Sequence, residues 1–309
     1  RPKLFYVEGD ADALVPAAAP PPSDYMWASA PQAASLLLNE EAARSAPRRT
    51  YGVKEQHRNS WGWKVSAYLW TKSVAAGAFL VPALAALSER RALLPVHSAA
   101  ALVFLALTAV LLVWDLRQPR RFLWTLTRPQ WRSWLVRGAY ILTAYGGLLT
   151  LALLSALNVV PWPLPAALVA LTLLAAVASA VYTAFLFGQA KGRDLWQSAL
   201  LGPHLLVQAL AAGAALFAPG WLLWLLPANG LLVAGEVWGR HATEDARRAA
   251  HIIQDDPRFS SGVLAAGHLL PLALLWGGVA PGVVAALVLL GLYVWEHLYV
   301  QAPQQVPLA

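Results

Sequence analysis

Four ionisable side chains lie within or at the ends of long apolar runs, where a charge is costly and is usually retained for function. Lys72 lies inside the first run, Asp115 closes the second, Arg137 opens the third, and Glu236 lies near the end of the sixth. Such groups typically relay protons or neutralise one another. The two basic residues can pair with the two acidic ones, and we expect Lys72 and Asp115 to share one proton path. The alternative is that these side chains only reach out to the membrane surface.

Three histidines in or beside the apolar runs suggest a different chemistry. His97 begins the second run, while His204 and His268 lie in the first halves of the fifth and seventh. A b-type haem needs two histidines that face each other across a helix bundle, and only His204 and His268 share a level. Ordinary packed or hydrogen-bonded histidines are the other interpretation. The chain has no cysteine, which excludes cysteine-ligated iron–sulfur clusters within it. We expect no haem, iron–sulfur cluster or metal ion in this chain.

Membrane-spanning helices must position these residues. Only 13% of the 309 residues are charged and 58% are hydrophobic, whereas a soluble domain carries about 25% charged residues. Apolar runs long enough to cross a hydrocarbon core of about 30 Å repeat between prolines and glycines. The predicted spans are 64–87, 94–115, 134–157, 164–188, 199–217, 221–239, 259–278 and 280–300. We expect an all-α integral membrane protein with about eight transmembrane helices in two four-helix bundles. Merging either tight hairpin, at 218–220 or 277–282, would give seven.

The first 60 residues differ from the rest, because no apolar run there can span a bilayer. Scattered aromatic residues favour an extended extramembrane arm that contacts a partner subunit, with one short helix near 33–45. A disordered tail is the alternative. The expected organisation is an arm at 1–60, a membrane domain at 61–300 and a short C-terminal tail at 301–309.

Basic residues separate by side of the membrane. An even number of spans places both termini on one side. Of the 23 Lys and Arg residues, Arg90 and Arg91 lie on the other side and Lys72 lies within a span, leaving 20 on the side of the termini. The positive-inside rule then places both termini in the cytoplasm, in a multi-pass protein of the cell membrane. A basic surface can also be a docking face for an acidic partner. The net charge of +7 does not indicate nucleic-acid binding, because the basic residues lie in short loops.

Short motifs follow one another in a defined order along the spans. They are Trp61, Gly62 and Trp63 at the opening of the first span, Tyr68 to Lys72 within it, Trp114 and Asp115 at the end of the second, Arg128 to Trp134 and Gly138 to Tyr140 around the start of the third, and Tyr182 and then Gln189 to Trp196 at and after the end of the fourth. This pattern, over about residues 60–300, resembles the NrfD-type family, which includes the membrane subunit of polysulfide reductase. The order of the motifs and the eight-span count carry the resemblance, since each motif alone is loose.

The resemblance implies a haem-free subunit of a respiratory oxidoreductase that binds a quinone, either menaquinone or ubiquinone. Its quinone site is built from the start of the first span and the end of the fourth. The candidate cofactor-binding residues are Trp61, Trp63, Tyr68, Tyr140, Tyr182 and Arg193, and the candidate proton-handling residues are Lys72, Asp115 and Glu236. Tyr68 stands where the family has a quinone-contacting histidine, and Val65 stands where it has an asparagine. Asp115 matches the family's acidic residue with a shift of one position.

The partners implied by the resemblance are a four-cluster ferredoxin-type iron–sulfur subunit and a molybdopterin-type catalytic subunit, besides membrane lipids. Residues 1–7 look like the C-terminal end of such an iron–sulfur subunit, so the chain can be a segment of a fusion with the cluster domain upstream. Two other functions compete: a secondary transporter and a haem b-containing membrane anchor. A transporter would show inverted repeats and broken helices at the midplane, and only Gly146 and Gly147 give such a signal.

Overall fold

The computed structural model describes residues 61–89, 93–116, 122–160 and 165–306. Every regular element within these ranges is a helix. The predicted arm at 1–60, with its short helix near 33–45, lies outside the described residues. The described residues belong to one compact unit, and that unit contains the whole candidate membrane domain.

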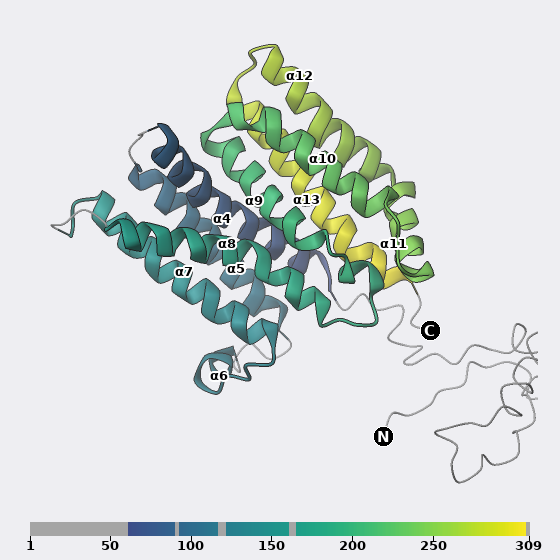
Figure 1. Cartoon of the computed structure of the whole chain (residues 1–309), viewed down its shortest axis with the longest axis horizontal. Helices are drawn as coiled ribbons and strands as arrows, with labels where there is room; N and C mark the ends of the chain where they lie inside the picture. Colours follow the sequence, from purple (N-terminus) through teal and green to yellow (C-terminus); the bar gives the residue numbers. More distant parts are fainter. Residues whose placement is uncertain (1–60, 90–92, 117–121, 161–164, 307–309) are drawn as a thin grey trace, which may run out of the picture. The chain divides into compact units, whose positions relative to one another are not determined.

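The first four long helices form a closed bundle. They are α4 (Trp63–Glu89), α5 (Pro95–Asp115), α7 (Trp134–Ala156) and α8 (Ala166–Gly188). Helix α4 packs against α5 and α8, and α7 packs against the same two helices (Figure 1). Small and aromatic side chains from all four helices fill the centre of this bundle. A short helix, α6 (Phe122–Thr127), lies between α5 and α7 in the chain.

The later helices form a second bundle. They are α9 (Leu201–Phe217), α10 (Leu222–Trp238), a helix made of η6 (Phe259–Leu269) and α12 (Leu270–Trp276), and α13 (Pro281–Gln305). Helix α9 packs against α10 and α13, and the η6–α12 helix packs against the same two. The η6 segment has π-helical hydrogen bonding, a wider geometry that often occurs near functional sites.

Helices occupy all eight predicted spans. Among the described residues, seven are long and apolar enough to cross a membrane. The eighth, α9, has 17 residues, or about 25 Å at 1.5 Å per residue. It contacts α4, α8, α10 and α13, so other helices, rather than lipid, pack on several of its sides. The predicted all-α membrane fold with about eight spans in two four-helix bundles is therefore confirmed.

Both tight hairpins are present, so neither pair of spans merges. Ala218 and the short η5 helix (Pro219–Trp221) connect α9 to α10. Gly278, with φ of 67°, lies in the turn between α12 and α13. This left-handed backbone conformation is one that glycine adopts without the strain of a side chain.

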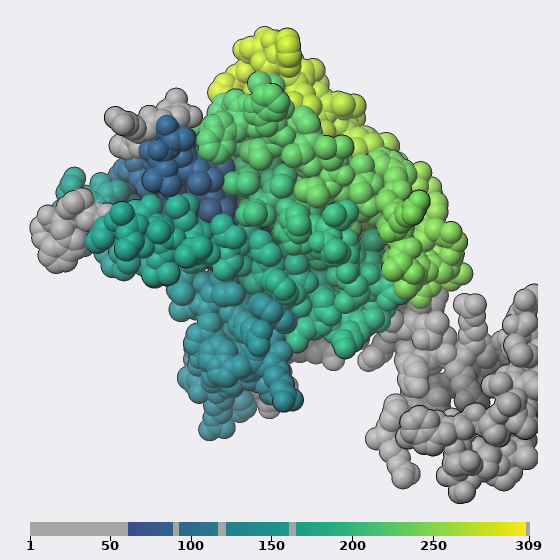
Figure 2. Space-filling view, in the orientation of Figure 1, coloured from purple at the N-terminus to yellow at the C-terminus, as the bar shows by residue number. Residues whose placement is uncertain are grey.

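The two bundles meet where α4 crosses α9. A Cβ added to Gly77 would lie 1.8 Å from the carbonyl oxygen of Ala209, and one added to Gly213 would lie 2.0 Å from the carbonyl oxygen of Gly77. The backbones of the two helices are therefore in contact, as small residues allow in membrane helix pairs. Gly267 and Gly291 give η6 and α13 a similar contact. The space-filling view shows the first and second bundles meeting without a gap on this face (Figure 2).

The charged stretch at 240–258 is not the simple loop that the sequence indicated. It contains an amphipathic helix, α11 (Glu244–Asp255), whose start is capped by the side chain of Thr243. At its end, the guanidinium of Arg258 donates to both carboxylate oxygens of Asp256, at 2.9 and 2.7 Å. These hydrogen bonds lower the pKa of the Asp256 carboxyl and link α11 to the start of η6.

The last helix also extends beyond its predicted end. Helix α13 continues to Gln305 and includes Pro303, so the boundary proposed between the membrane domain and a tail at 301–309 does not match the helix. Arg193 Nη1 donates to the carbonyl oxygens of Pro303 and Val306, at 2.9 and 2.6 Å. Carbonyl groups at a helix C-terminus lack intrahelical partners. The observed role of Arg193 is therefore to hold the end of α13.

Candidate functional site

Lys72 is fully buried in the first bundle, with 0% of its surface exposed. Its ammonium donates to the carbonyl oxygen of Ala180 at 2.5 Å and to Thr183 Oγ1 at 3.0 Å, both on α8. An ammonium group carries three N–H donors. Two are used by these neutral groups, which leaves the third for a carboxylate or a bound ligand.

Glu296 of α13 is the acidic residue whose charge acts on Lys72, but no ion pair within 4.0 Å joins the two side chains in the described part of the chain. Glu296 is 3% exposed. The Gln208 amide fits its surroundings when its nitrogen donates to Glu296 Oε1 at 2.7 Å and its oxygen accepts from Trp295 Nε1 at 2.9 Å. A buried carboxylate therefore has both an opposite charge and a hydrogen-bond donor, which together lower the cost of burial. The sequence reasoning did not include Glu296, although the same rule that selected Lys72 applies to it.

Two buried tyrosines lie beside this pair. The Tyr182 ring centre is 5.4 Å from Lys72 Nζ. Tyr68, one turn before Lys72 on α4, has its hydroxyl close to that of Tyr182, but the approach falls short of an ordinary hydrogen bond. The Tyr68 hydroxyl is buried without a partner among the described side chains. An orphaned buried hydroxyl is costly unless a water or ligand satisfies it. The structure thus brings together three predicted residues, Tyr68, Lys72 and Tyr182.

Aromatic rings cover the same end of the first bundle. Trp61 stacks on Trp196, with ring centres 4.7 Å apart and an interplanar angle of 15°. Phe187 stacks on Trp196 at 4.9 Å. These rings pack in one buried cluster that includes Tyr68. Trp61 therefore belongs to an aromatic stack that packs with Tyr68, and its role in binding a cofactor stays a prediction.

Trp63 and Asp115 lie further out. Trp63 is 51% exposed and packs edge-on against Trp114 at 5.7 Å. Lys64 Nζ lies 4.6 Å from the Trp114 ring centre, and its charge acts on Asp115.

No ion pair joins Lys72 to Asp115 in the described part of the chain. The charge of Lys64 acts on Asp115, and that of Glu296 acts on Lys72. The charge of Asp115 also acts on Tyr68, one turn before Lys72, and the shared proton path stays a prediction.

Two further predicted residues make contacts around the loop between α6 and α7. The Tyr140 hydroxyl donates to the carbonyl oxygen of Leu126 at 2.5 Å. Arg137 Nε donates to the carbonyl oxygen of Trp131 at 2.6 Å, and its guanidinium lies over the Trp134 ring. Arg137 thus binds a backbone carbonyl in place of the acidic partner that the sequence suggested. The observed contacts of both residues hold the loop.

Glu236 is buried in the second bundle, with 2% of its surface exposed. Its Oε2 accepts a hydrogen bond from the Tyr299 hydroxyl at 3.4 Å. Its Oε1 has no hydrogen-bond partner among the described residues. Glu236 therefore does not snorkel to the surface, and it does not pair directly with Lys72.

The two haem candidates take part in a hydrogen-bonded cluster. His268 Nε2 lies 3.0 Å from Asn229 Nδ2, and its Nδ1 lies 2.8 Å from the carbonyl oxygen of Val263. His204 Nε2 lies 3.3 Å from the side-chain amide of Gln208. Both ring nitrogens of His268 thus have protein partners. This arrangement favours the interpretation of ordinary packed, hydrogen-bonded histidines over that of haem ligands.

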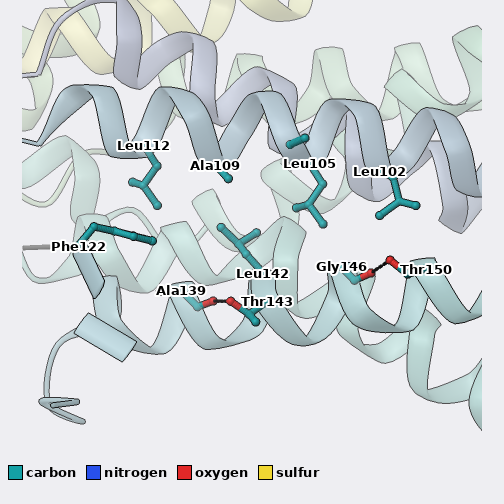
Figure 3. A pocket seen from close by; sticks show the side chains of 11 residues that line it. Leu102, Leu105, Ala109, Leu112, Phe122, Ala139, Leu142, Thr143, Gly146 and Thr150 are labelled. Carbon is teal, nitrogen blue, oxygen red and sulfur yellow. Dashed lines mark hydrogen bonds between the residues drawn. The ribbon is translucent and has the colours of Figure 1, made fainter. Parts of the chain in front are cut away.

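A groove of about 320 Å³ between α5 and α7 is lined mainly by apolar side chains, among them Leu105, Leu112 and Leu142 (Figure 3). The hydroxyls of its two threonines, Thr143 and Thr150, donate to carbonyl oxygens of their own helix at 2.8 Å. The groove therefore offers hydrocarbon contact rather than acid–base groups.

The model of the family described as polysulphide reductase, NrfD, matches residues 52–226, which is more than half of the chain. The chain belongs to the NrfD family. The matched region includes the whole first NrfD bundle, and so contains Tyr68, Lys72, Asp115 and Tyr182. Glu236 and Glu296 lie outside it. No curated protein matches the chain.

Proposed function

We propose that this NrfD-family chain is the quinone-handling membrane subunit of a respiratory oxidoreductase complex, and that the quinone head group binds beside Tyr68, Lys72 and Tyr182. Family membership implies a membrane subunit of an oxidoreductase complex. The observation that supports the finer proposal is the buried Lys72, whose ammonium is hydrogen-bonded to α8 and lies beside the Tyr182 ring, with the charge of the buried Glu296 acting on it.

These residues have the chemistry that a quinone requires. A quinone presents two carbonyl oxygens on a flat ring, and its conversion to quinol takes up two electrons and two protons. The Tyr182 hydroxyl and the third N–H of Lys72 supply hydrogen bonds to a carbonyl oxygen. Glu296 accepts or supplies the accompanying proton. The orphaned Tyr68 hydroxyl gains a partner when the head group binds.

The electrons pass to a partner, since this cysteine-free chain has no thiolates to hold an iron–sulfur cluster. The proposed partners are a four-cluster ferredoxin-type iron–sulfur subunit and a molybdopterin-type catalytic subunit. The proposed quinone is menaquinone or ubiquinone. In this account the arm at 1–60 lies against the iron–sulfur subunit.

The assembled complex should retain quinone after purification. Extraction of the purified complex into organic solvent, followed by chromatography, is expected to yield menaquinone or ubiquinone near one molecule per chain. A visible spectrum of this chain purified without partners is expected to lack a Soret band. A Soret band together with a quinone-free extract would favour the haem-anchor interpretation and contradict the proposal.

Gly138 of α7 provides a way to disturb Tyr182 without changing it. A Cβ on Gly138 would lie 2.2 Å from Tyr182 Cε2. Gly138→Ala should therefore displace the ring and lower the free energy of unfolding by about 1–3 kcal/mol, the usual cost of overpacking. It should also raise the KM for quinone. Thermal unfolding and quinone titration measure the two effects.

The matched control is Gly147→Ala on the same helix, where an added Cβ has no neighbour within 4 Å. This variant should leave the KM unchanged. Equal effects of the two substitutions would mean that the Tyr182 position is irrelevant to quinone use.

The charge distribution predicts that both termini face the cytoplasm. A cysteine introduced by Ala309→Cys should resist membrane-impermeant thiol reagents in intact cells and react after permeabilisation. The chain has no native cysteine, so any label reports this position. Labelling in intact cells would reverse the orientation and indicate that the basic face is a docking surface.

A further inference from the structure

A second polar site lies in the second bundle, where η4 (Asp194–Gln197), the end of α10 and the start of α11 meet. A pocket of about 470 Å³ is lined there by Ser198, Glu236, Arg240 and His241. Two buried atoms at this pocket, Glu236 Oε1 and His241 Nε2, have no hydrogen-bond partner among the described residues. A polar cavity with unsatisfied groups is one that water occupies.

From this pocket a series of buried groups leads toward Lys72. The Tyr299 oxygen lies 3.0 Å from the carbonyl oxygen of Leu195 and 3.4 Å from Glu236 Oε2, and its single hydroxyl proton can point to either acceptor. Tyr299 lies three residues after Glu296 on α13, which places the two side chains on one helix face. The charge of Glu296 acts on Tyr299 and on Lys72. These charges act through space, so proton transfer between the two bundles needs a bridging water at each of these two steps.

The groups also lie at increasing depth from the membrane surface. Glu236 is in the last turn of α10. Tyr299 and Glu296 are in the second and third turns from the end of α13, and Lys72 is in the third turn of α4. All of these helix ends lie on the side that carries the termini. The series therefore runs from the pocket near that surface inward to the buried pair.

We infer that the pocket beside Glu236 is a water-filled proton port, and that Glu236, Tyr299 and Glu296 relay protons between it and the quinone site. This inference rests on the proposed function. In the outward direction Glu296 passes a proton to the Tyr299 oxygen while the Tyr299 hydroxyl proton moves to Glu236. Glu236 then releases that proton to water in the pocket. The inward direction reverses each step, and water bridges the gaps that exceed hydrogen-bond distance.

The test uses the assembled complex and three variants. Glu236→Gln keeps the size of the side chain and removes its proton affinity, and is expected to lower quinone-linked turnover about 100-fold, the low end for a positioned proton-transfer group. Tyr299→Phe should lower it as well. Asp255→Asn removes an exposed carboxylate of α11 and should leave turnover unchanged. Quinone affinity should be unchanged in all three.

A structural role for Glu236 is separated by rescue. Glu236→Ala leaves room for an added carboxylate, so millimolar acetate should restore much of the turnover that this variant loses, and Glu236→Asp should retain activity. Normal turnover of Glu236→Gln, or lost turnover that neither acetate nor aspartate restores, would overturn the proton port. A wild-type complex that binds no quinone would overturn the proposed function itself, whereas intact quinone binding confines the failure to the relay.

Discussion

Replacing Lys72 by methionine is expected to abolish most quinone-linked turnover and to destabilise the protein. The change removes the positive charge that acts on the carboxylate of Glu296, a side chain that is only 3% exposed. The buried Glu296 carboxylate is then left without an opposite charge, which should lower the free energy of unfolding by up to about 3 kcal/mol, the low end for a buried ion pair in direct contact. The turnover should fall at least about 100-fold, as for loss of a positioned proton-transfer group. Thermal unfolding and a quinol oxidation assay measure the two effects.

The double variant Lys72→Met with Glu296→Gln separates stability from chemistry. Removing both charges should recover much of the stability that Lys72→Met loses, whereas the turnover should remain as low as in either single variant. Residues that act as one unit give such non-additive effects. Lys191→Met, at an exposed loop position, is the control and should change neither quantity. Additive losses of stability would show that Lys72 and Glu296 do not interact.

Tyr182→Phe should slow quinone-linked turnover about 100-fold while the complex still assembles. The substitution removes only the hydroxyl, so the ring still fills the space beside Gly138. The quinone would lose a hydrogen-bond donor next to Lys72. Steady-state kinetics with a soluble quinol analogue measure the change, and size-exclusion chromatography checks assembly.

Tyr293→Phe is the matched control, since the Tyr293 ring is half-buried and packs against Trp70 and His297, and no contact of Tyr293 with Lys72 or Tyr182 is seen among the described residues. It should leave the kinetics unchanged. If Tyr182→Phe also had unchanged turnover and KM, Tyr182 would not belong to the quinone site.

The sequence was sufficient for the spans because each span is a local property of hydrophobicity and length. The two glycine and proline hairpins were identified for the same reason, as Gly278 illustrates. Helix α11 was missed because its high charge was interpreted as a loop, although alanines and an isoleucine recur there at helical spacing. The last predicted span ended at residue 300, whereas α13 continues to Gln305 and includes Pro303.

The candidate site was predicted only in part. The family motifs placed Tyr68, Lys72 and Tyr182 in one layer, and the structure brings them together. The charge that acts on Lys72 belongs to Glu296 of α13. Helix α13 contacts α4 because the two bundles join where α4 crosses α9, at Gly77 and Gly213. Such long-range packing leaves no periodic signal in the sequence. Asp115, which is close to Lys72 in chain order, therefore looked like the better partner.

The most direct measurement of the central claim is the location of bound quinone in the assembled complex. A photoreactive quinone, irradiated in membranes and mapped by mass spectrometry, should label peptides from the start of α4 and the end of α8 that carry Tyr68, Lys72 and Tyr182. Excess native quinone should compete with this labelling. Labelling confined to the helices from α10 to α13, or labelling that native quinone does not compete with, would contradict a quinone site in the first bundle.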